Sequence, residues 1–359
     1  MLTFVVMPCL DEVDLVAGAI ASLGFSGEES PPPDTRLVVV DNGSTDGTIP
    51  LLKEIRSRSR ATVHIVTEAV RGFVPPRRRG VAEAQGVARS LGVTEDDVLI
   101  LQADADTVYR REYVATMQRA VADTAGVLLE GSTKPPPDFV STHPSYFAAQ
   151  RLVDDETDLL DAEDEDEVVL DDKVCGYRLS DYLTWGGLFE ERTPAGDAIH
   201  AETTRMFIRA RLRHGARKLR VNPAGASSSR RKVVDNPWLQ YATVGFPREA
   251  SWIKALAGRT EQAGDVDQFS SAVLHGREPE AVYLRRAHQL ALFRYLPALI
   301  AESGGAKSRA DQPADVAAAL AALTSWSASE IEHEPGRALL SVLNLIDTRP
   351  DLFGGRKSQ

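Results

Sequence analysis

The sequence has little cysteine and lacks long apolar runs. Only Cys9 and Cys175 are cysteines among 359 residues, which gives neither a disulfide framework nor a zinc-binding spacing. A small buried core residue is the expected role of each, and a reducing compartment fits best. No apolar stretch could span a bilayer, and Leu2 to Met7 opens without the basic leader of a signal peptide. We therefore expect a cytoplasmic protein without a transmembrane segment; peripheral membrane contact stays open.

Aromatic residues are also scarce, at 6%, and the net charge is −11. Neither property favours nucleic acid as a partner, because nucleic-acid binding relies on basic surfaces and stacking side chains. The negative charge is concentrated in residues 154–172, which hold twelve acidic residues and no Lys or Arg. A run of this kind is typical of a solvated or mobile segment. We expect no nucleic-acid partner and a mobile acidic segment at 154–172.

Several signatures of nucleotide and hydrolytic enzymes are missing from the sequence. There is no Gly-x-Gly-x-x-Gly and no Gly-x-x-x-x-Gly-Lys-Ser/Thr, which argues against a dinucleotide oxidoreductase and a P-loop enzyme. A His-Glu-x-x-His zinc motif and a Gly-x-Ser-x-Gly nucleophile elbow are missing too.

The first third of the chain alternates short apolar runs with helical patterns. The strand-like runs are Leu2–Met7, Arg36–Val40, Val63–Val66, Val98–Leu101 and Gly126–Leu129. The helix-like segments are Glu12–Leu23, Thr48–Arg58, Val81–Leu91 and Arg111–Ala122, with Asp46 as a candidate cap of the second. This alternation predicts an α/β fold with a mainly parallel sheet flanked by helices.

The rest of the chain is less regular and then becomes helical. A helix is expected over Ile199–His214, followed by a strand at Lys218–Val221 that ends at Asn222-Pro223. From Asn236 onward the sequence is rich in Ala and Leu. We therefore expect an α/β catalytic domain over residues 1–234 and a helical C-terminal region over 235–359.

Two polar clusters directly follow apolar runs of the predicted sheet. One is Asp41-Asn42-Gly43-Ser44-Thr45-Asp46, and the other is Asp104-Ala105-Asp106. In open α/β sheets ligands bind beyond the carboxyl ends of the strands, so both clusters should lie at one edge. Mg²⁺ and Mn²⁺ often take few protein carboxylates together with phosphate oxygens. The second cluster therefore suits a metal-diphosphate site, although Asp-x-Asp alone is common in surface turns.

Taken together, these motifs resemble the family 2 glycosyltransferases of the GT-A fold, over roughly residues 1–130. The matching segments, in order, are Pro8-Cys9-Leu10-Asp11-Glu12, Val39 to Thr48, Arg77-Arg78-Arg79-Gly80 with Ala84-Gln85-Gly86, and Asp104-Ala105-Asp106. As a set they are specific, whereas each alone is not. The resemblance implies a Rossmann-like GT-A sheet and an enzyme that binds a nucleotide-sugar.

The resemblance also implies roles for individual residues. Pro8, Glu12 and Asp41 would line the nucleoside pocket, with Asn42 and Arg77 as further donor-binding residues. Asp104 would lie near the ribose and the metal, and Asp106 would be the principal metal ligand. Three positions depart from the family pattern, since Asp11 replaces an Asn, Asn42 an Asp, and Arg78 the Asn of the Arg-Asn-x-Gly loop. The last departure leaves the role of Arg77 open.

The catalytic base has two candidates. In the family a Glu-Asp pair begins a later helix; here Glu202 matches the Glu, while Thr203 stands in place of the Asp. Asp197, five residues earlier, is the other candidate, since an inverting transfer needs a carboxylate to take the acceptor proton. Either residue could instead only cap the helix. Arg230 and Arg231 lie in a Ser-Ser-Arg-Arg element and suit contact with the diphosphate.

The sequence therefore predicts a glycosyltransferase that uses Mn²⁺ or Mg²⁺ and moves a sugar from a UDP-, GDP- or dTDP-linked donor to an acceptor hydroxyl. Two alternatives stay open, a sugar-phosphate nucleotidyltransferase and a noncatalytic nucleotide-sugar-binding protein on the same fold.

Overall fold

The computed structural model describes residues 1–27, 30–121, 125–159, 166–244, 250, 252–253 and 265–354. The chain forms two compact units, each assembled from separate segments. The sheet unit contains residues 1–135, 170–190 and 202–229, and the helical unit contains 136–169, 191–201 and 230–359. The division differs from the expected boundary at 234 because two segments from the middle of the chain join the helical unit.

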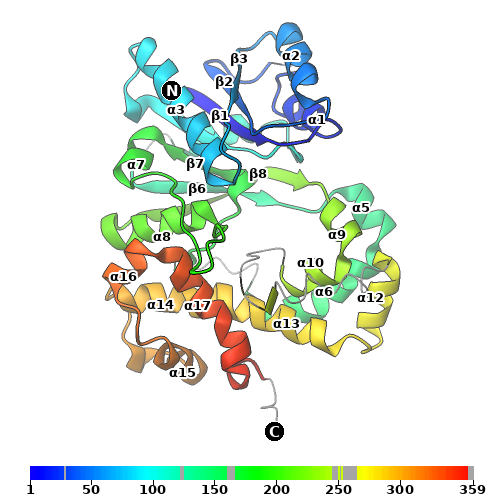
Figure 1. Ribbon diagram of the computed structural model, residues 1–359, viewed down its shortest axis with the longest axis vertical. Helices are drawn as coiled ribbons and strands as arrows, with labels where there is room; N and C mark the ends of the chain where they lie inside the picture. Colours follow the sequence, from blue (N-terminus) through cyan, green and yellow to red (C-terminus); the bar gives the residue numbers. More distant parts are fainter. Residues whose placement is uncertain are drawn as a thin grey trace. The chain divides into compact units, whose positions relative to one another are not determined.

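The sheet unit is built on one eight-stranded sheet in the order β3-β2-β1-β4-β7-β6-β8-β5 (Figure 1). Its strands are β1 Leu2–Cys9, β2 Thr35–Asp41, β3 Val63–Thr67, β4 Val98–Gln102, β5 Thr107–Tyr109, β6 Val127–Thr133, β7 Cys175–Arg178 and β8 Arg217–Ser228. The first four strands are mutually parallel, whereas β7 is antiparallel to β4 and β6, and β5 is antiparallel to β8. The α/β class is confirmed, and the sheet is mixed rather than parallel throughout.

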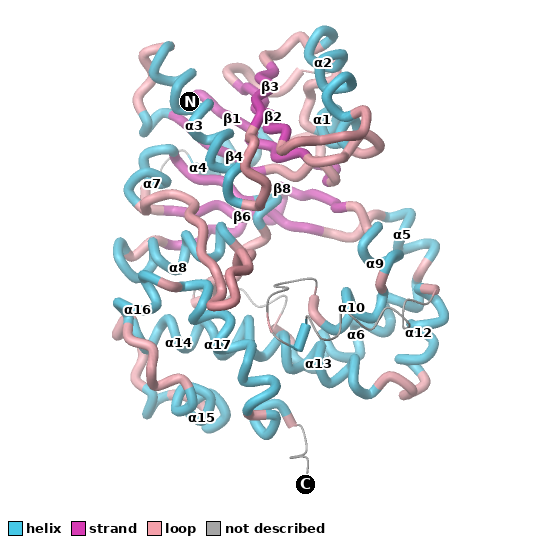
Figure 2. The backbone as a smooth tube through the Cα atoms, viewed as in Figure 1, coloured by secondary structure: helices cyan, strands magenta, loops and turns pink. Residues whose placement is uncertain are grey.

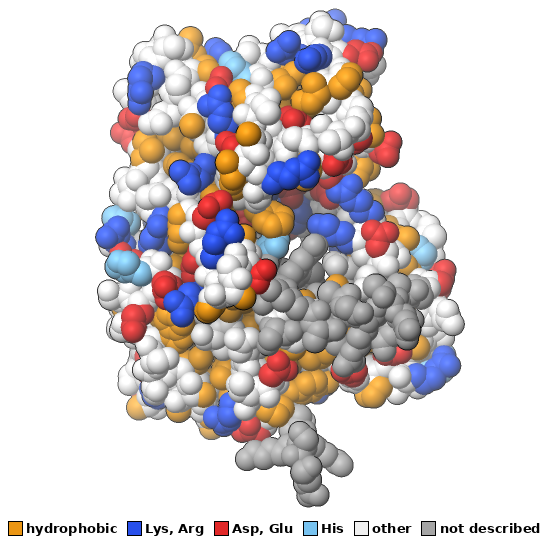
Figure 3. Space-filling view, in the orientation of Figure 1, with side chains coloured by type: hydrophobic (Ala, Val, Ile, Leu, Met, Phe, Trp, Pro, Cys, Tyr) orange, Lys and Arg blue, Asp and Glu red, His pale blue; other side chains and the backbone are white. Residues whose placement is uncertain are grey.

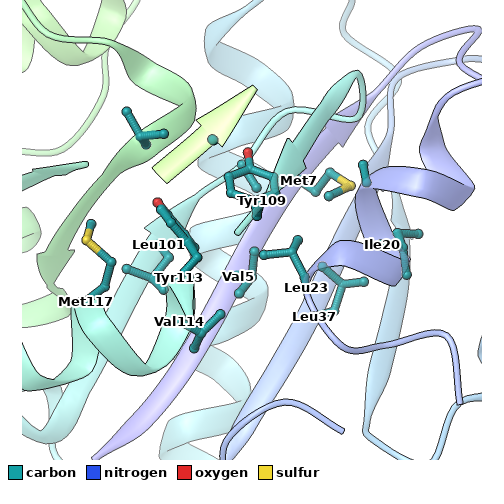
Figure 4. Close-up of a cluster of buried hydrophobic side chains, with 14 of the residues drawn as sticks. Val5, Met7, Ile20, Leu23, Leu37, Leu101, Tyr109, Tyr113, Val114 and Met117 are labelled. Carbon is teal, nitrogen blue, oxygen red and sulfur yellow. The ribbon is translucent and has the colours of Figure 1, made fainter. Parts of the chain in front are cut away.

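Successive side chains of β1 point to opposite faces of the sheet, so the strand contributes to the core on both faces. Val5 and Met7 of β1 pack into a cluster with α1 (Val16–Ser22), α2 (Thr48–Arg58) and α4 (Tyr113–Val121), part of which is shown in Figure 4. Val6 faces the other side, against α3 (Val74–Ser90). A Cβ on Gly80 of α3 would lie 2.3 Å from Val6 Cγ1, so glycine allows the close approach of this helix to the sheet.

Most expected elements are present, with shifted ends that have local causes. Helix α1 begins at Val16 rather than Glu12, since the amides of Glu12 and Val13 bind the side chains of Thr48 and Asp46. Helix α3 begins seven residues earlier than expected, at Val74, with proline in its first turn. The N-cap of α2 is Gly47, and Asp46 Oδ1 accepts from the first helical amide, Thr48 N, at 2.9 Å.

The expectation that the last strand ends at Asn222-Pro223 is wrong, because β8 continues to Ser228. Its register with β6 shifts where Glu130 faces Arg220 but Ser132 faces Gly225. This irregularity accommodates the proline, which cannot donate to a ladder. The longer strand pairs with β5, where Thr107 lies opposite Ser228.

The helices of the helical unit come from two of its three chain segments, 136–169 and 230–359 (Figure 2). Its helices include α5 Pro137–Thr142, α6 Pro144–Thr157, α9 Arg231–Asp235, α10 Pro237–Ala242, α12 Val266–Leu274, α13 Pro279–Leu290, α14 Leu296–Ser303, α15 Ala314–Ala322, α16 Ala328–His333 and α17 Pro335–Thr348. A π-helical segment, Ala291–Tyr295, joins α13 to α14. Residues 279–303 therefore form one run of helix with a widened turn in it.

The ends of the acidic segment are packed, which corrects the expectation of a wholly mobile run. Asp154 accepts two hydrogen bonds of 2.8 Å from the buried guanidinium of Arg285. Glu167 is buried, and Asp171 is bound by Thr133 and Lys173. Residues 160–165 of this segment lie outside the described residues.

Both cysteines are free and buried, as expected for core residues. Burial, helped by the nearby charge of Glu12, raises the pKa of Cys9, which keeps the thiol protonated. Within the described residues, no helix combines the length and apolarity needed to cross a membrane. On the face shown in Figure 3, the described Lys and Arg side chains are interspersed with Asp and Glu.

Candidate active site

The register of the parallel strands brings the loops after β1, β2 and β4 to one edge of the sheet. Cys9 of β1 lies opposite Asp41 of β2, and Val6 lies opposite Gln102 of β4. The backbone continues this pairing, with Asn42 N donating to Cys9 O and Ala103 N donating to Val6 O, both at 2.9 Å. The expectation that the two polar clusters leave the same edge is confirmed.

Side chains of the first two loops bind each other's backbone. Asp11 takes a left-handed conformation, with φ of 52°, and its Oδ1 accepts from Thr45 N at 2.6 Å. In return Asp11 N donates to Ser44 Oγ at 3.0 Å, and Glu12 N donates to Thr48 Oγ1 at 3.0 Å. These reciprocal bonds fix the segment after Pro8 against the segment after Asp41.

Asp41 and Asn42 fix the loops at this edge of the sheet through side-chain hydrogen bonds to the backbone. The buried carboxylate of Asp41 accepts from Gly43 N at 3.1 Å and from Ser44 N at 3.2 Å. The amide of Asn42 binds the loop after β3, through Nδ2 donating to Glu68 O and Val70 O and Oδ1 accepting from Gly72 N. Its polar atoms therefore perform a structural task, which an aspartate could not, because a carboxylate cannot donate to carbonyl oxygens.

Arg77 of α3 is the centre of a buried polar network. Its Nη2 donates to Asp104 Oδ1 at 2.7 Å, its Nε to Glu202 Oε1 at 2.9 Å, and its Nη1 to Gln102 Oε1 at 3.0 Å. Burial alone would lower the pKa of Arg77, but the carboxylates of Asp104 and Glu202 raise it above its ordinary value. A permanently charged guanidinium therefore joins the helix α3, the end of β4 and α8 (Glu202–His214).

Asp104 and Asp106 follow β4 on a loop that is held by backbone contacts. Asp104 N donates to the hydroxyl of the buried Tyr109, which donates to Lys173 O at 3.0 Å. Tyr109 packs beside Tyr113 of α4 in the core (Figure 4). Asp106 O accepts from Ser229 N at 2.9 Å, and its Oδ1 accepts from the Thr107 hydroxyl at 3.2 Å. Both carboxylates are half-buried, so they remain partly accessible at this edge.

Helix α8 begins inside the network, at Glu202. The sequence predicted a helix from Ile199, three residues earlier. Residues 199–201 are not helical, because Ile199 N donates to Glu191 O and Ala201 has a φ of 67°. Glu202 and Thr203 are both buried in the first turn. The hydroxyl of Thr203 accepts from Gln102 Nε2 at 2.9 Å, so α8 is bound to β4 as well as to Arg77.

Two residues of the network were not expected from the sequence. Gln102 is a polar residue that ends the buried strand Val-Leu-Ile-Leu-Gln, a signal that could have identified it. Asp172 lies in the short 3-10 helix η2 (Asp172–Val174), near the charges of Glu202, Arg77 and Asp104. Burial and the charge of Glu202 raise the pKa of Asp172 to about 8, so it holds a proton at neutral pH. Nothing distinguished Asp172 within the acidic run.

The other predicted site residues lie in the helical unit. Asp197 is exposed in a hairpin turn, where its backbone amide donates to Thr193 Oγ1 at 3.2 Å. Arg230 and Arg231 stand at the start of α9, with Arg231 exposed. The structure therefore brings Glu202, Arg77 and Asp104 together, and places Asp197, Arg230 and Arg231 in the other unit.

The residues at this edge of the sheet suit a divalent cation that takes only one or two ligands from the protein and the rest from phosphate and water. Across the described part of the chain, no group of three or more His, Cys, Asp and Glu side chains is placed to hold a metal ion. Asp104 and Asp106 nevertheless offer hard carboxylate oxygens two residues apart, beyond the end of a strand. Mg²⁺ commonly uses one or two carboxylates and completes its shell with phosphate oxygens and water.

The glycosyl transferase family 2 model matches residues 4–182. No curated protein sequence gives a match. The 1–349 portion of S. aureus TarS is similar in structure, with 13% identity, coverage of 100% of this chain and 93% of that portion, and a TM-score of 0.46. The mannosyltransferase PcManGT of Pyrobaculum calidifontis has 15% identity, coverage of 97% and 87%, and a TM-score of 0.47. At these identities and TM-scores the two structures carry no argument about the site.

Proposed function

This chain belongs to glycosyl transferase family 2 through residues 4–182, and on that premise we propose that it transfers a sugar from a nucleotide-diphosphate-sugar to an acceptor hydroxyl. The observation that carries the proposal is the network in which Arg77 joins Asp104 and Glu202 at the carboxyl edge of β4. The guanidinium of Arg77 binds two carboxylates that have different surroundings. Such a pair suits a transfer in which one carboxylate helps to stabilise the leaving diphosphate and the other removes a proton from the acceptor.

The donor would lie over the loops after β1 and β2. We assign the nucleoside to Pro8, Glu12 and Asp41, because reciprocal side-chain bonds fix these two loops against each other. Asn42 supports this pocket indirectly, through the loop after β3. Arg77 also acts indirectly in this proposal, since its three donor nitrogens already hold Gln102, Asp104 and Glu202.

Asp106 and Asp104 are the residues that would hold Mn²⁺ or Mg²⁺. When bound, such a cation supplies Lewis-acid neutralisation of the departing diphosphate. The hydrogen bond from Arg77 to Oδ1 orients Asp104, and the contacts with Ser229 and Thr107 fix Asp106. Arg230 or Arg231 would add a guanidinium contact to the diphosphate.

We assign the proton acceptor to Glu202, which is buried in the same network as Asp104, and keep Asp197 as the second candidate. Replacing the base should lower kcat by about 10²–10⁴-fold. Glu202→Gln and Asp197→Asn, assayed side by side, separate the two assignments. An unchanged kcat in Glu202→Gln would reject ours.

The test of the donor is a thermal-shift screen of UDP-glucose, GDP-mannose and dTDP-glucose, with and without Mn²⁺. A donor at a hundred times its Kd should stabilise the fold by about 2.7 kcal/mol. The nucleotide-sugar with the largest shift is then assayed for nucleoside diphosphate release with Mn²⁺. Asp106→Ala should abolish the Mn²⁺-dependent part, whereas Glu112→Gln, at an exposed position, should not.

One observation favours a second candidate, noncatalytic binding of a nucleotide-sugar. Thr203 stands where the family usually places an acid at the start of this helix, and its hydroxyl is engaged by Gln102. Donor binding in the thermal screen without turnover across a broad panel of acceptor hydroxyls would support this candidate over transfer.

A further inference from the structure

The loop that carries Asp104 and Asp106 is tied to the sheet at both ends. At its start Ala103 N donates to a carbonyl oxygen of β1 at 2.9 Å, and at its end Tyr109 of β5 pairs with β8. Between these ends Thr107 N donates to Asp104 O at 3.3 Å. Because the ends are fixed, the orientation of the peptide groups between them decides where the two carboxylates lie.

One side chain reaches back across this loop. The hydroxyl of Tyr109 accepts from Asp104 N at 2.9 Å and donates to Lys173 O at 3.0 Å. A tyrosine hydroxyl can do both at once, because it has one hydrogen and free lone pairs. Burial raises the pKa of Tyr109, so the hydroxyl keeps the hydrogen that it donates to Lys173. The peptide group of Asp104 is thereby linked to a segment outside the loop.

The ring that carries this hydroxyl is itself held in place. Tyr109 is 3% exposed and belongs to the core of the sheet unit. Its backbone N donates to Ser22 Oγ, in the last residue of α1, at 2.9 Å. Its ring lies beside that of Tyr113, with 4.8 Å between the ring centroids (Figure 4). The hydroxyl therefore has little freedom to follow a movement of the loop.

The segment that supplies the carbonyl of Lys173 is fixed on two sides. Asp171 N donates to the buried Glu130 Oε1, on β6, at 2.8 Å. Leu170 N donates to Thr204 Oγ1, on α8, at 3.0 Å. The acceptor of the Tyr109 hydrogen thus belongs to a segment that is bound to the sheet and to α8.

Asp104 is consequently held at two points. Arg77 Nη2 donates to its Oδ1 at 2.7 Å, and its backbone N donates to Tyr109. The first bond fixes a carboxylate oxygen, whereas the second fixes the peptide group from which the chain continues to Asp106. Loss of the second bond alone would leave the Asp104 side chain bound and allow the backbone between Asp104 and Asp106 to move.

We propose that Tyr109 is a positioning residue of the transferase site: its hydroxyl fixes the peptide group of Asp104 and so sets where the carboxylates of Asp104 and Asp106 lie for a divalent cation. The inference rests on the proposed function, since it concerns how the proposed cation site is held. Tyr109 acts through the loop and touches no substrate. Groups that orient metal ligands in this way typically change metal affinity about 10–100-fold when they are removed.

Tyr109→Phe is the direct test, because phenylalanine keeps the ring and removes only the hydroxyl. Binding of Mn²⁺ in the presence of UDP, GDP or dTDP is followed by the electron paramagnetic resonance signal of free Mn²⁺. We expect the Kd of Mn²⁺ to rise about 10–100-fold. The matched control is Tyr113→Phe, because Tyr113 is 1% exposed and its hydroxyl has no hydrogen-bond partner among the described residues. This control should bind Mn²⁺ like the wild type.

Two further measurements distinguish positioning from general damage to the fold. The Mn²⁺ concentration that gives half-maximal turnover should rise in Tyr109→Phe by the same factor as the Kd, while kcat at saturating Mn²⁺ changes far less. Without any ligand, the Asp104 amide should exchange with solvent deuterium faster in Tyr109→Phe than in Tyr113→Phe. Equal exchange of this amide in the two variants would contradict the inference.

Ser22→Ala carries the test if Tyr109→Phe does not fold, because the Ser22 hydroxyl holds the backbone of Tyr109. It should raise the Kd of Mn²⁺ by a smaller factor than Tyr109→Phe. An unchanged Kd in whichever variant folds, with clear binding by the wild type, would reject the role of Tyr109 and leave the proposed function intact. No Mn²⁺ binding by the wild type with any of the three nucleoside diphosphates would reject the proposed cation site, and this inference with it.

Discussion

Replacing Arg77 by methionine should destabilise the sheet unit by about 3–5 kcal/mol, since removing one partner of a buried ion pair leaves the other charge uncompensated. The magnitude follows from the contacts. Arg77 has a side-chain exposure of 9% and neutralises Glu202, whose side chain is 4% exposed. It also binds the partly exposed carboxylate of Asp104 and the side-chain amide oxygen of Gln102. Methionine fills the volume of the aliphatic stem and supplies none of these three bonds.

Arg77→Lys should be intermediate, at about 2–3 kcal/mol. A lysine keeps the charge, but a single ammonium cannot present three donors along the fork of a guanidinium. Each bond lost to a charged partner is worth about 1.5–3 kcal/mol. The matched control is Arg79→Met on the same helix, because Arg79 is 41% exposed and its ion pair with Glu83 is 3.6 Å long. Loss of an exposed pair should cost less than about 1 kcal/mol.

The assay is urea unfolding at neutral pH, followed by circular dichroism, with the transition midpoints compared among the four proteins. The expected order of stability is wild type and Arg79→Met, then Arg77→Lys, then Arg77→Met. If Arg77→Met and Arg79→Met unfold at the same urea concentration, the three contacts of Arg77 make no net contribution to the free energy of unfolding. Arg77 then cannot be the residue that organises the site.

Two further substitutions test how the site is supported. Gly80→Ala should cost about 1–3 kcal/mol, because the added Cβ would lie 2.3 Å from Val6 Cγ1, whereas Gly86→Ala meets nothing within 4 Å and should be neutral or stabilising; equal midpoints for the two variants would show that α3 does not need this close approach. Asn42→Asp should cost about 2–3 kcal/mol at neutral pH, because a carboxylate would face the two carbonyl oxygens that Nδ2 now binds at 2.9 and 2.8 Å. The exposed Asn344→Asp is its control, and equal stabilities would rule out the structural task assigned to Asn42.

Much of the sheet unit could be predicted because its signals are local. Apolar runs followed by turns gave five of the strands, and each run begins or ends within a few residues of the observed element. The clusters at Asp41 and Asp104 could be placed at one edge, since parallel strands leave their carboxyl ends together. The irregular pairing that lets β8 pass Pro223 could not be predicted, as it depends on how β6 lies beside it.

The acidic segment shows where composition misleads. Its charge predicted a solvated run, yet Asp154 binds the buried Arg285 and Asp172 is part of the site. The partner of Asp154 is far away in sequence, since Arg285 lies 131 residues from it. Composition reports how many charges a segment has, and only their partners decide whether those charges are solvated or buried.

By itself, the sequence determined the α/β class, the strand-end position of Asp41 and Asp104, and the similarity to glycosyl transferase family 2, because periodicity and short motifs are properties of neighbouring residues. Only the tertiary structure decided that Arg77 holds Glu202 and Asp104 at once, and that Asp172 of the acidic run lies near the charges of the same network. Those contacts join residues from separate parts of the chain. Their energies come from burial and from the distance between charges, which no local pattern encodes.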